Sequence, residues 1–559
     1  MRRLFPFSLL FFGLTAALFV LQMIPFIGIF LMFLLAMFWS VLLINAGMIG
    51  IAVEAAIGRV PRWWLVVPLV FYGGYWAVAA QDYMTMRQLG AAYDAANAKV
   101  MTGFDPIRQA LAFDGDGRND EGPWLTQNYG LPVAYSANSN FQERFLSHRM
   151  MGKEICAKVR ETPALRAAFV NVFGFHDGDA IRDRKMESRF CTLSMPERPE
   201  LPLVRISRME TKGHETSLPI TRVTTTITMP NGRKLKLLGG HAAPLGWIPM
   251  PIMGCGLNSG APSWDCDAGF WRKGFTPIVS GDTRYSRDSA VLARALGLKR
   301  VSITERRGGD TALALEKLAK VEQATLERQL AAIDVMITDP LAKADWQVGV
   351  VSNHPEVLES RADAIMTGFE RAAAVDGDDR GRARESGRIL GGLLARLPKA
   401  RLAGFGSRIL TVYGQAGDEH WLWDTEPLLR RLGDLGPGAL PYLLNRRASS
   451  SSVNNAGIEG LCRIGPAARE GAEPVLLDRW RRTDRFDRDE RAALYVAMRR
   501  IGITPPPLPT DGKKDQIAEL QAQWADISPA SPPRACAVRA ERQARREEQY
   551  DGKRRTNLE

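Results

Sequence analysis

The chain has 559 residues and a formal net charge of +12, with 24% charged and 46% hydrophobic residues. About 475 residues follow an apolar N-terminal part, which is ample for two or more globular units of roughly 100 to 200 residues each. A basic chain would ordinarily suggest a nucleic-acid partner, but the side of the membrane predicted below argues against nucleic acid. The basic surface instead favours anionic lipid headgroups or acidic partners, or it simply keeps the protein soluble.

Two uncharged runs dominate the N-terminal part. Residues Leu4 to Val53 contain no Asp, Glu, Lys or Arg, and a second such run extends from Trp63 to Gln81. A bilayer core of about 30 Å takes about 20 helical residues, so the first run is more than twice one crossing. Pro25 is the expected turn within it, because proline removes a backbone donor. We therefore predict a three-helix transmembrane anchor in residues 1–82, with spans at 4–22, 28–52 and 63–81. A cleaved signal peptide is the alternative, but the run is too long for one.

Basic residues predict the orientation of this anchor. Arg2 and Arg3 precede the first span, and Arg59 and Arg62 separate the second from the third. The positive-inside rule then places the N-terminus in the cytoplasm of a bacterium and, after three inner-membrane crossings, the bulk of the chain in the periplasm. Aromatic residues around the third span are expected to anchor at the membrane interface; they are Trp63, Trp64, Tyr72, Tyr75, Trp76 and Tyr83.

The predicted spans lack the ionisable side chains that mark a transport pathway. Gln22 and Asn45 are their most polar residues, and Glu54 lies at an edge. Transporters and pumps place ionisable groups within the hydrocarbon region, so the spans indicate an anchor or a helix-packing platform.

The six cysteines suggest an oxidising compartment. Cys255 and Cys266 bracket a turn-rich segment, and a disulfide between them would remove about 3 kcal/mol of unfolded-state freedom. Cys156 and Cys191 are candidates for a second bridge, although four cysteines allow three pairings. Because there is no Cys-x-x-Cys pair, we predict neither a metal nor another cofactor. Cys462 is expected to be a small buried hydrophobic residue.

The middle of the chain changes character several times. Region 83–200 is expected to be mainly helical, and its acidic segment 114–121 is expected to be a solvated turn, since it lacks the calcium-loop spacing. Region 201–285 is predicted to be a small β-rich unit, because Pro230-Asn231-Gly232 separates two runs with strand composition. The cysteine pair lies in a glycine-rich loop of this unit, and irregular loops on a stable scaffold often carry function.

Helix is predicted again in region 286–375. Asp310 is a plausible N-cap of a helix that ends before Asp339-Pro340. A stripe along one face of this helix predicts core packing; it consists of Leu326, Leu330, Ile333 and Ile337.

Region 386–503 contains an internal echo. Leu432-Gly-Asp-Leu-Gly-Pro-Gly-Ala439 is repeated twenty-nine residues later as Leu461-Cys-Arg-Ile-Gly-Pro-Ala-Ala468, and each copy is followed by a proline and an apolar helix. This pattern resembles HEAT-type helical repeats, although the period is shorter than their usual length of about 40 residues. The resemblance implies an α-solenoid whose extended surface holds another macromolecule.

Several arginines of the repeat region are candidates for contact with an acidic partner, and the alternative is that they form a solvated face. They are Arg430, Arg431, Arg446, Arg447, Arg479, Arg481 and Arg482. Residues 504–559, which are rich in proline and then in charge, are expected to form a linker and a mobile tail, interrupted by a short helix near 514–526.

Sequence signatures of common enzymes are absent, among them the nucleophile elbow, the phosphate-binding loop and the zinc-binding His-Glu-x-x-His motif. This absence lowers the expectation of catalysis without removing it, and no catalytic residue is assigned. We expect a mainly α membrane protein that acts as a scaffold or adaptor of an envelope complex and binds another envelope protein. The alternative is a periplasmic hydrolase acting on cell-wall or lipid substrates, with His241, Asp265 and Asp267 in its site.

Overall fold

A computed structural model describes most of the chain, and its parts form two compact units. Unit 1 comprises residues 1–152 and 173–309, and unit 2 comprises residues 153–172 and 310–559. The fold is mixed α+β, with 57% helix and 16% strand. The described residues are 4–22, 38–115, 121–139, 143–173, 189–257, 264–279, 287–302, 305–343, 347–416, 425–444, 451–483, 488–507 and 516–538.

Unit 1 begins with three helices, of which two are long and apolar enough to cross a membrane. They are α3 (Phe38–Ala56) and α4 (Val66–Asn97), the latter preceded by the 3-10 helix η1 (Arg62–Leu65). The first helix, α1 (Leu9–Gln22), has 14 residues and extends about 21 Å, less than the roughly 30 Å of a bilayer core. The expected three spans are therefore corrected to two in the described part of the chain. The predicted turn at Pro25 lies outside that part.

The start of α1 is fixed to the end of α3. Both carboxylate oxygens of Glu54 accept backbone N–H groups, from Phe7 at 2.8 Å and from Ser8 at 2.9 Å. A carboxylate beside the first turn of a helix compensates its unpaired donors and its dipole. The indole of Trp64 also donates to the carbonyl of Leu4. Glu54, at the edge of the apolar run, thus joins the start of α1 to the end of α3.

A nine-stranded sheet has the order β11-β8-β7-β6-β1-β2-β3-β5-β4, and all its strands except β4 belong entirely to unit 1. Strand β1 runs parallel to β2 and β6, and the other described pairings are antiparallel. The bounds are β1 Ala110–Phe113, β2 Ala134–Ala137, β3 Phe145–Gly152, β4 Asn171–Phe173, β5 Phe190–Pro196, β6 Leu203–Glu215, β7 Leu218–Thr228, β8 Lys234–Ala242 and β11 Thr276–Pro277.

The sheet is larger than the small β unit expected for region 201–285. Region 83–200, expected to be mainly helical, contributes the five strands β1 to β5. Three of these strands, β1, β2 and β5, are buried along all or nearly all of their length, so no alternation of buried and exposed positions marks them.

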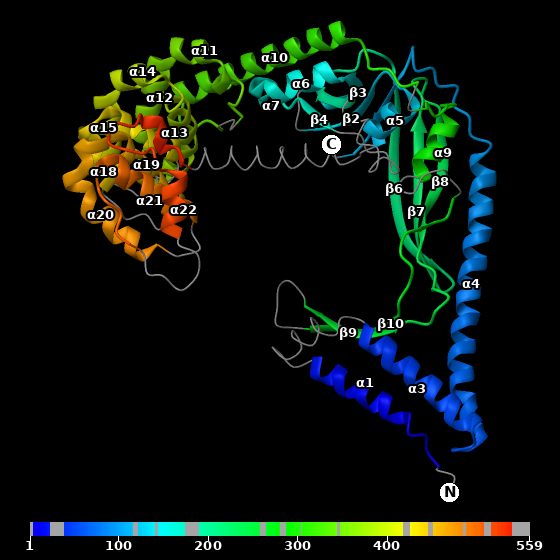
Figure 1. Ribbon diagram of the computed structural model, residues 1–559. Coiled ribbons are helices and arrows are strands. Elements are labelled where there is room, and N and C mark those ends of the chain that lie inside the picture. Colours follow the sequence, from blue (N-terminus) through cyan, green and yellow to red (C-terminus); the bar gives the residue numbers. More distant parts are fainter. Residues whose placement is uncertain are drawn as a thin grey trace. The chain divides into compact units, whose positions relative to one another are not determined.

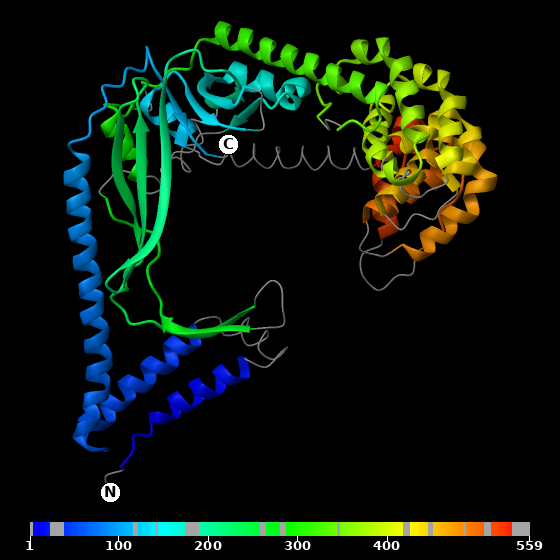
Figure 2. The same cartoon turned by 180° about the vertical axis from the view of Figure 1, so that it is seen from behind.

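Helices cover the sheet and bury its core. Helices α5 (Glu121–Tyr129) and α9 (Arg287–Ala295) pack on the sheet, and α4 runs alongside the long strands β6, β7 and β8 (Figures 1 and 2). One buried cluster joins Leu111 and Phe113 of β1 with Val204 of β6 and Leu292 of α9. A smaller cluster, Leu218, Ile220, Ala242 and Ile278, packs against Met86, Leu89 and Tyr93 of α4.

The predicted hairpin at Pro230-Asn231-Gly232 is confirmed. Strands β7 and β8 pair antiparallel on either side of it, and Gly232 has a φ of +82°, which glycine adopts without strain. A second hairpin, β9 (Pro251–Leu257) with β10 (Trp264–Phe270), follows and places Cys255 opposite Cys266.

Unit 2 consists mainly of helices joined by short turns. The predicted cap is confirmed, because the side chain of Asp310 accepts the N–H groups of Ala312 and Leu313 at the start of α10 (Thr311–Thr338). The other helices are α6 Lys153–Glu161, α7 Pro163–Ala167, α11 Pro355–Ser360, α12 Ala362–Ala373, α13 Arg380–Leu394, α14 Lys399–Gly404, α15 Gly406–Ala416, α17 Glu426–Arg431, α18 Leu440–Leu444, α19 Ser451–Ile464, α20 Arg469–Arg482, α21 Arg488–Ile501 and α22 Gln516–Gln523.

The two copies of the echoed sequence adopt matching turns. Gly436 and Gly465 stand at equivalent positions and have φ values of +86° and +78°. Each turn leads into a 3-10 helix with a proline at its start, η6 (Pro437–Ala439) and η7 (Gly465–Ala468). A side chain at Gly433 would collide with the carbonyl of Gly460, so glycine allows these two segments to approach closely.

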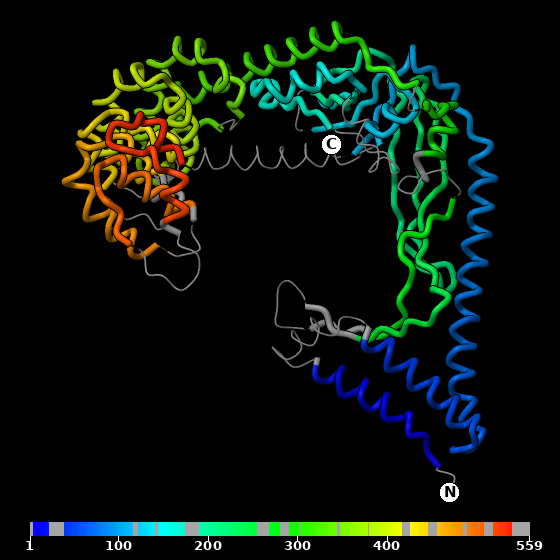
Figure 3. The backbone as a smooth tube through the Cα atoms, viewed as in Figure 1, coloured from blue at the N-terminus to red at the C-terminus, as the bar shows by residue number. Residues whose placement is uncertain are grey.

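Residues 516–538 are packed in unit 2. The short helix expected near 514–526 is α22 (Gln516–Gln523), and the mobile end expected from Ser528 onward is corrected as far as residue 538. Trp524 and Val538 are buried, and Cys536 in the 3-10 helix η8 (Pro533–Cys536) forms a disulfide with Cys462 of α19. Figure 3 shows this red segment lying against the orange helices of the same unit. The proline content predicted a linker, but a few apolar residues are enough to hold the segment on the helices. Residues 539–559 lie outside the described part.

Candidate functional site

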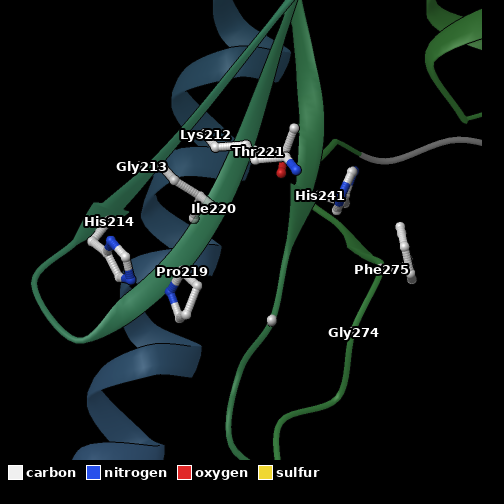
Figure 4. A pocket seen from close by; sticks show the side chains of 10 residues that line it. Lys212, Gly213, His214, Pro219, Ile220, Thr221, His241, Gly274 and Phe275 are labelled. Atoms are coloured by element: carbon white, nitrogen blue, oxygen red, sulfur yellow. The ribbon is translucent and has the colours of Figure 1, made fainter. Parts of the chain in front are cut away.

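A cavity of about 440 Å³ lies on the long strands of unit 1. Its lining includes Lys212 and His214 of β6, Thr221 of β7, His241 of β8, and Gly274 and Phe275 of the segment before β11. Figure 4 shows these side chains on the face of the strands that points away from α4.

Strand register brings the polar lining residues together. Lys212 pairs with Thr221, and Thr221 pairs with His241, so the three lie in one row across β6, β7 and β8. Directly opposed residues share a face of the sheet, as do residues two apart along a strand. His214 therefore lies on the same face as Lys212, one step closer to the β6–β7 turn.

Backbone conformation at two positions shapes the cavity. A side chain at Gly240 would collide with the carbonyl of Thr221, and the φ of Gly240 is +129°, so only glycine fits beside His241. Phe275 has a φ of +58°, which is rare for a bulky residue, and its ring lies 4.9 Å from that of His241. A strained conformation at the rim of a cavity often accompanies a functional constraint.

The chemistry of the cavity is that of a binding site for an anion. Its described lining offers a lysine ammonium, two imidazoles and a hydroxyl, together with apolar surface from Pro219 and Phe275. No carboxylate and no cysteine is among these lining residues. The nearest acid in sequence, Glu215, forms an ion pair with Arg222, so its charge is already balanced.

His241 is therefore in a cavity, as the hydrolase alternative expected for the glycine-rich region, but the rest of the proposed set is not shown with it. Asp265 and Asp267 lie on β10, which pairs with β9 in a separate sheet, and their side chains lie outside the described part.

A buried ion pair fastens α4 to the base of the sheet. Asp82 is completely buried and accepts hydrogen bonds from Ser217 at 2.7 Å, from Leu245 N at 3.2 Å and from Arg272 at 2.7 Å. A buried carboxylate is tolerated only with such partners. Sequence reasoning missed this cluster, although Asp82 is the first charged residue after the uncharged run that ends at Gln81, which was an available signal.

The aromatic residues expected at the membrane interface also bind the segment 245–249. The hydroxyl of Tyr75 donates to the carbonyls of Gly246 and Ile248, and the indole of Trp76 donates to that of Trp247. Tyr83 stacks on Trp247, and Tyr72 donates to Asn45 of α3. Trp63 and Trp64 stack on each other. Four of the six residues thus join α4 to other parts of unit 1 in addition to any lipid contact.

A second polar cluster is buried beneath α5. The Nε2 atom of His148 lies 2.9 Å from Oγ of Ser136, and both side chains are almost fully buried. Burial lowers the pKa of His148 to about 4, with the Arg149 charge adding to the effect, so the imidazole is neutral at pH 7. A serine beside a neutral histidine is the arrangement of an activated nucleophile, but neither group reaches a cavity described here. We treat this pair as structural.

The predicted partner-binding arginines divide into two groups. Arg430 bonds Glu426 and Glu459, Arg431 bonds Asp434, and Arg479 bonds Glu490, so these three hold helices together. Arg481 and Arg482 at the end of α20 are exposed. Arg446 and Arg447 lie outside the described residues.

The cysteines are engaged in disulfides wherever their side chains are described. Cys156 and Cys191 are both disulfide-bonded, and two cysteine pairs lie at disulfide distance. Cys462 is buried as expected, but it is bonded to Cys536, so its assignment as a simple hydrophobic residue was wrong. The strand register places Cys255 opposite Cys266, while their side chains lie outside the described part.

Comparisons with known proteins found no relative of this chain. No protein-family model matches it, and neither a curated protein nor a solved structure is similar to it.

Proposed function

We propose that the protein is an inner-membrane-anchored scaffold or adaptor of an envelope complex, and that it binds a partner protein through a HEAT-like surface in the periplasm. The observation that carries this proposal is the contact between consecutive repeats. Arg430 bonds Glu459 and Asp434 faces Arg463, and both pairs join residues that are one period of twenty-nine apart. Contacts between residues one period apart are what stacked repeats require.

The anchor and its orientation are supported by contacts near the first helix. The bonds of Glu54 and Trp64 place residues 4–8 beside the α3–α4 connection, which contains Arg59 and Arg62. Arg2 and Arg3 directly precede this segment, so all four arginines belong to one side of the membrane. By the positive-inside rule that side is the cytoplasm, and the chain leaving α4 is on the other side.

Disulfides support the same assignment. Bridges such as Cys462–Cys536 persist in oxidising compartments and are rare in the cytosol. A scaffold facing the cytoplasm is the alternative; it requires an even number of crossings, and the described part of the chain holds two candidate spans. Reporter fusions after Gln81 and after Gly502 distinguish the two, since cytoplasmic reporter activity at both positions would exclude the periplasmic proposal.

A test of partner binding uses the exposed arginines. Charge reversal of Arg481 and Arg482 to Glu should abolish recovery of the partner when the tagged full-length protein is purified from detergent. Arg469→Glu is the matched control, because Arg469 is an exposed arginine at the other end of the same helix. If no protein is enriched with the unmodified chain above background, or if the double variant recovers the same partner as the unmodified chain, binding through this surface is excluded.

The hydrolase alternative keeps one observation in its favour, the position of His241 in a cavity. Hydrolysis of a lipid or cell-wall substrate needs a nucleophile activated by a base, or an acid–base pair; the described lining holds two histidines and a threonine, but no carboxylate that would orient them. Alanine substitutions at His241, Asp265 and Asp267 that preserve the cellular phenotype would exclude it. The cavity is better suited to binding than to hydrolysis.

A further inference from the structure

The cavity on β6, β7 and β8 lies close to the point where α4 emerges from its apolar run. Asp82 follows that run directly, and it accepts hydrogen bonds from Ser217 and from the N–H of Leu245. Ser217 belongs to the turn between β6 and β7, three residues after His214 of the cavity. If the apolar run lies in a bilayer, the open end of the cavity lies at the level of the headgroups.

Phe275 lines the cavity, and two further large apolar side chains, in a neighbouring segment, are exposed as it is. Phe275 is 80% exposed, Ile248 74% and Trp247 63%. They come from neighbouring segments, because Lys273 N donates to the carbonyl of Pro244 and Leu245 bridges Arg272. Exposed apolar patches of this kind mark an interaction surface, and aromatic residues beside a membrane helix are typical of the interfacial layer.

The polar part of the cavity complements a phosphate. Lys212 supplies a positive charge, and Thr221, His214 and His241 supply groups that donate hydrogen bonds to an anion. With no carboxylate among the described lining residues, nothing in the cavity repels a negative charge. Charge-assisted hydrogen bonds to phosphate are roughly twice as strong as neutral ones.

We propose that this cavity binds the phosphate-bearing headgroup of an anionic phospholipid from the surrounding membrane, with the exposed apolar residues Phe275, Trp247 and Ile248 lying against the adjoining acyl chains. This inference rests on the proposed membrane anchor. Besides the anchor, unit 1 would then have a second contact with the bilayer, and this contact would hold the long strands at a fixed height above the membrane.

The test places a photoreactive residue at the cavity. Full-length protein carrying benzoylphenylalanine in place of Phe275 is reconstituted in nanodiscs of phosphatidylcholine alone, or of phosphatidylcholine with a minor share of phosphatidylglycerol. After irradiation, mass spectrometry of the intact chain identifies the lipid adducts. We expect phosphatidylglycerol adducts well above its share of the lipid, whereas adducts in simple proportion to composition would overturn the proposal.

Substitutions in the cavity then assign the headgroup contact. Lys212→Gln, His214→Gln and His241→Gln should each lower the phosphatidylglycerol adduct by about tenfold, the effect of losing one hydrogen bond to a charged group. Lys234→Gln and Lys236→Gln are the controls, because they remove a charge near the far end of β8. Equal adducts in the cavity variants and the controls would count against these contacts.

Two further outcomes separate the ligand from the anchor. If inorganic phosphate binds the detergent-solubilised chain and prevents adduct formation in nanodiscs, the ligand is soluble phosphate and not a lipid. If the chain does not co-elute with nanodiscs, the anchor itself fails, and the lipid headgroup fails with it. Co-elution without lipid selectivity overturns the headgroup site and leaves the proposed anchor standing.

Discussion

Arg430 and Glu459 are twenty-nine positions apart in the chain, and an Nη atom of Arg430 lies 2.9 Å from a carboxylate oxygen of Glu459. The spacing equals that of the sequence echo. The second pair, Asp434 with Arg463, has the same spacing and the opposite direction of charge. Arg463 also bonds Glu459, so the four residues form one network that joins α17 and the following 3-10 helix (Leu432–Leu435) to α19. The network holds these segments together through charge as well as through apolar packing.

Removing one member of this network should destabilise unit 2. The side chains of Arg430 and Glu459 are 23% and 9% exposed, so truncation leaves a poorly solvated charge. We expect Arg430→Ala to lower the free energy of unfolding by about 2 kcal/mol, as measured by urea denaturation. The matched control is Arg482→Ala, whose ion pair with Asp478 is exposed and should contribute less than about 0.5 kcal/mol. Equal losses of unfolding free energy in the two variants would show that the network stabilises the fold no more than an exposed ion pair does.

Breaking the Cys462–Cys536 disulfide should release the C-terminal segment. The bridge closes a separation of 74 residues, and closing a loop of that length stabilises the folded state by about 4 kcal/mol in the chain-entropy model. We expect Cys462→Ser with Cys536→Ser to expose residues 516–538 to limited proteolysis while the rest of unit 2 remains protected. Alanine at exposed Arg534 in the same 3-10 helix serves as the control. A double variant as resistant as the control would mean that packing alone holds the segment.

Local signals in the sequence predicted several elements well. The Asn231-Gly232 turn fixed the β7–β8 hairpin, and counting outward from it pairs Thr221 with His241, which is the register that builds the cavity. Asp310 predicted a helix start because its capping bonds are made to residues two and three positions away. The echo around Gly436 and Gly465 was visible for the same reason, since a turn with positive φ demands glycine at a fixed position.

The remaining features depend on contacts that are distant in sequence. The hydrogen bond between Asp82 and Arg272 joins residues 190 positions apart, and no local sequence pattern predicts it. The position of Lys212 opposite Thr221 depends on the register of β6 and β7. The turn between these two strands contains Thr216 at a φ of +54° and no glycine, so the sequence does not mark it. Short buried strands such as β1 resemble helix in composition and gain their identity only from neighbours in the sheet.

The Asp82 cluster should be essential for attaching the sheet to α4. Asp82→Asn preserves the shape of the side chain but leaves Arg272 without its counter-charge in a largely buried site. We expect a loss of about 3 kcal/mol in unfolding free energy, together with faster hydrogen exchange at the N–H of Leu245. Asp105→Asn is the control, because its partner Arg108 is exposed. Unchanged exchange at Leu245 in Asp82→Asn would show that Asp82 does not hold this segment.

Protonation of His148 should destabilise unit 1 in acid. Burial holds the folded-state pKa of His148 at about 4, whereas the ordinary value is 6.5. Above pH 6.5 the imidazole is neutral in both states, and between pH 6.5 and 4 only the unfolded state binds the proton. Stability contributed by the neutral form is therefore complete above pH 6.5 and is lost as the pH falls to 4, by about 3 kcal/mol in total.

The variant His148→Gln isolates this effect, because glutamine keeps a polar group facing Ser136 and does not titrate. Urea denaturation at a series of pH values should show a shallower loss of stability between pH 6.5 and 4 than in the unmodified chain. His354→Gln, which alters a partly exposed histidine of unit 2, should leave the acid slope of unit 1 unchanged. If the slope of His148→Gln matches that of the unmodified chain, the acid sensitivity has another origin, and the buried Ser136–His148 contact is simply a packed hydrogen bond.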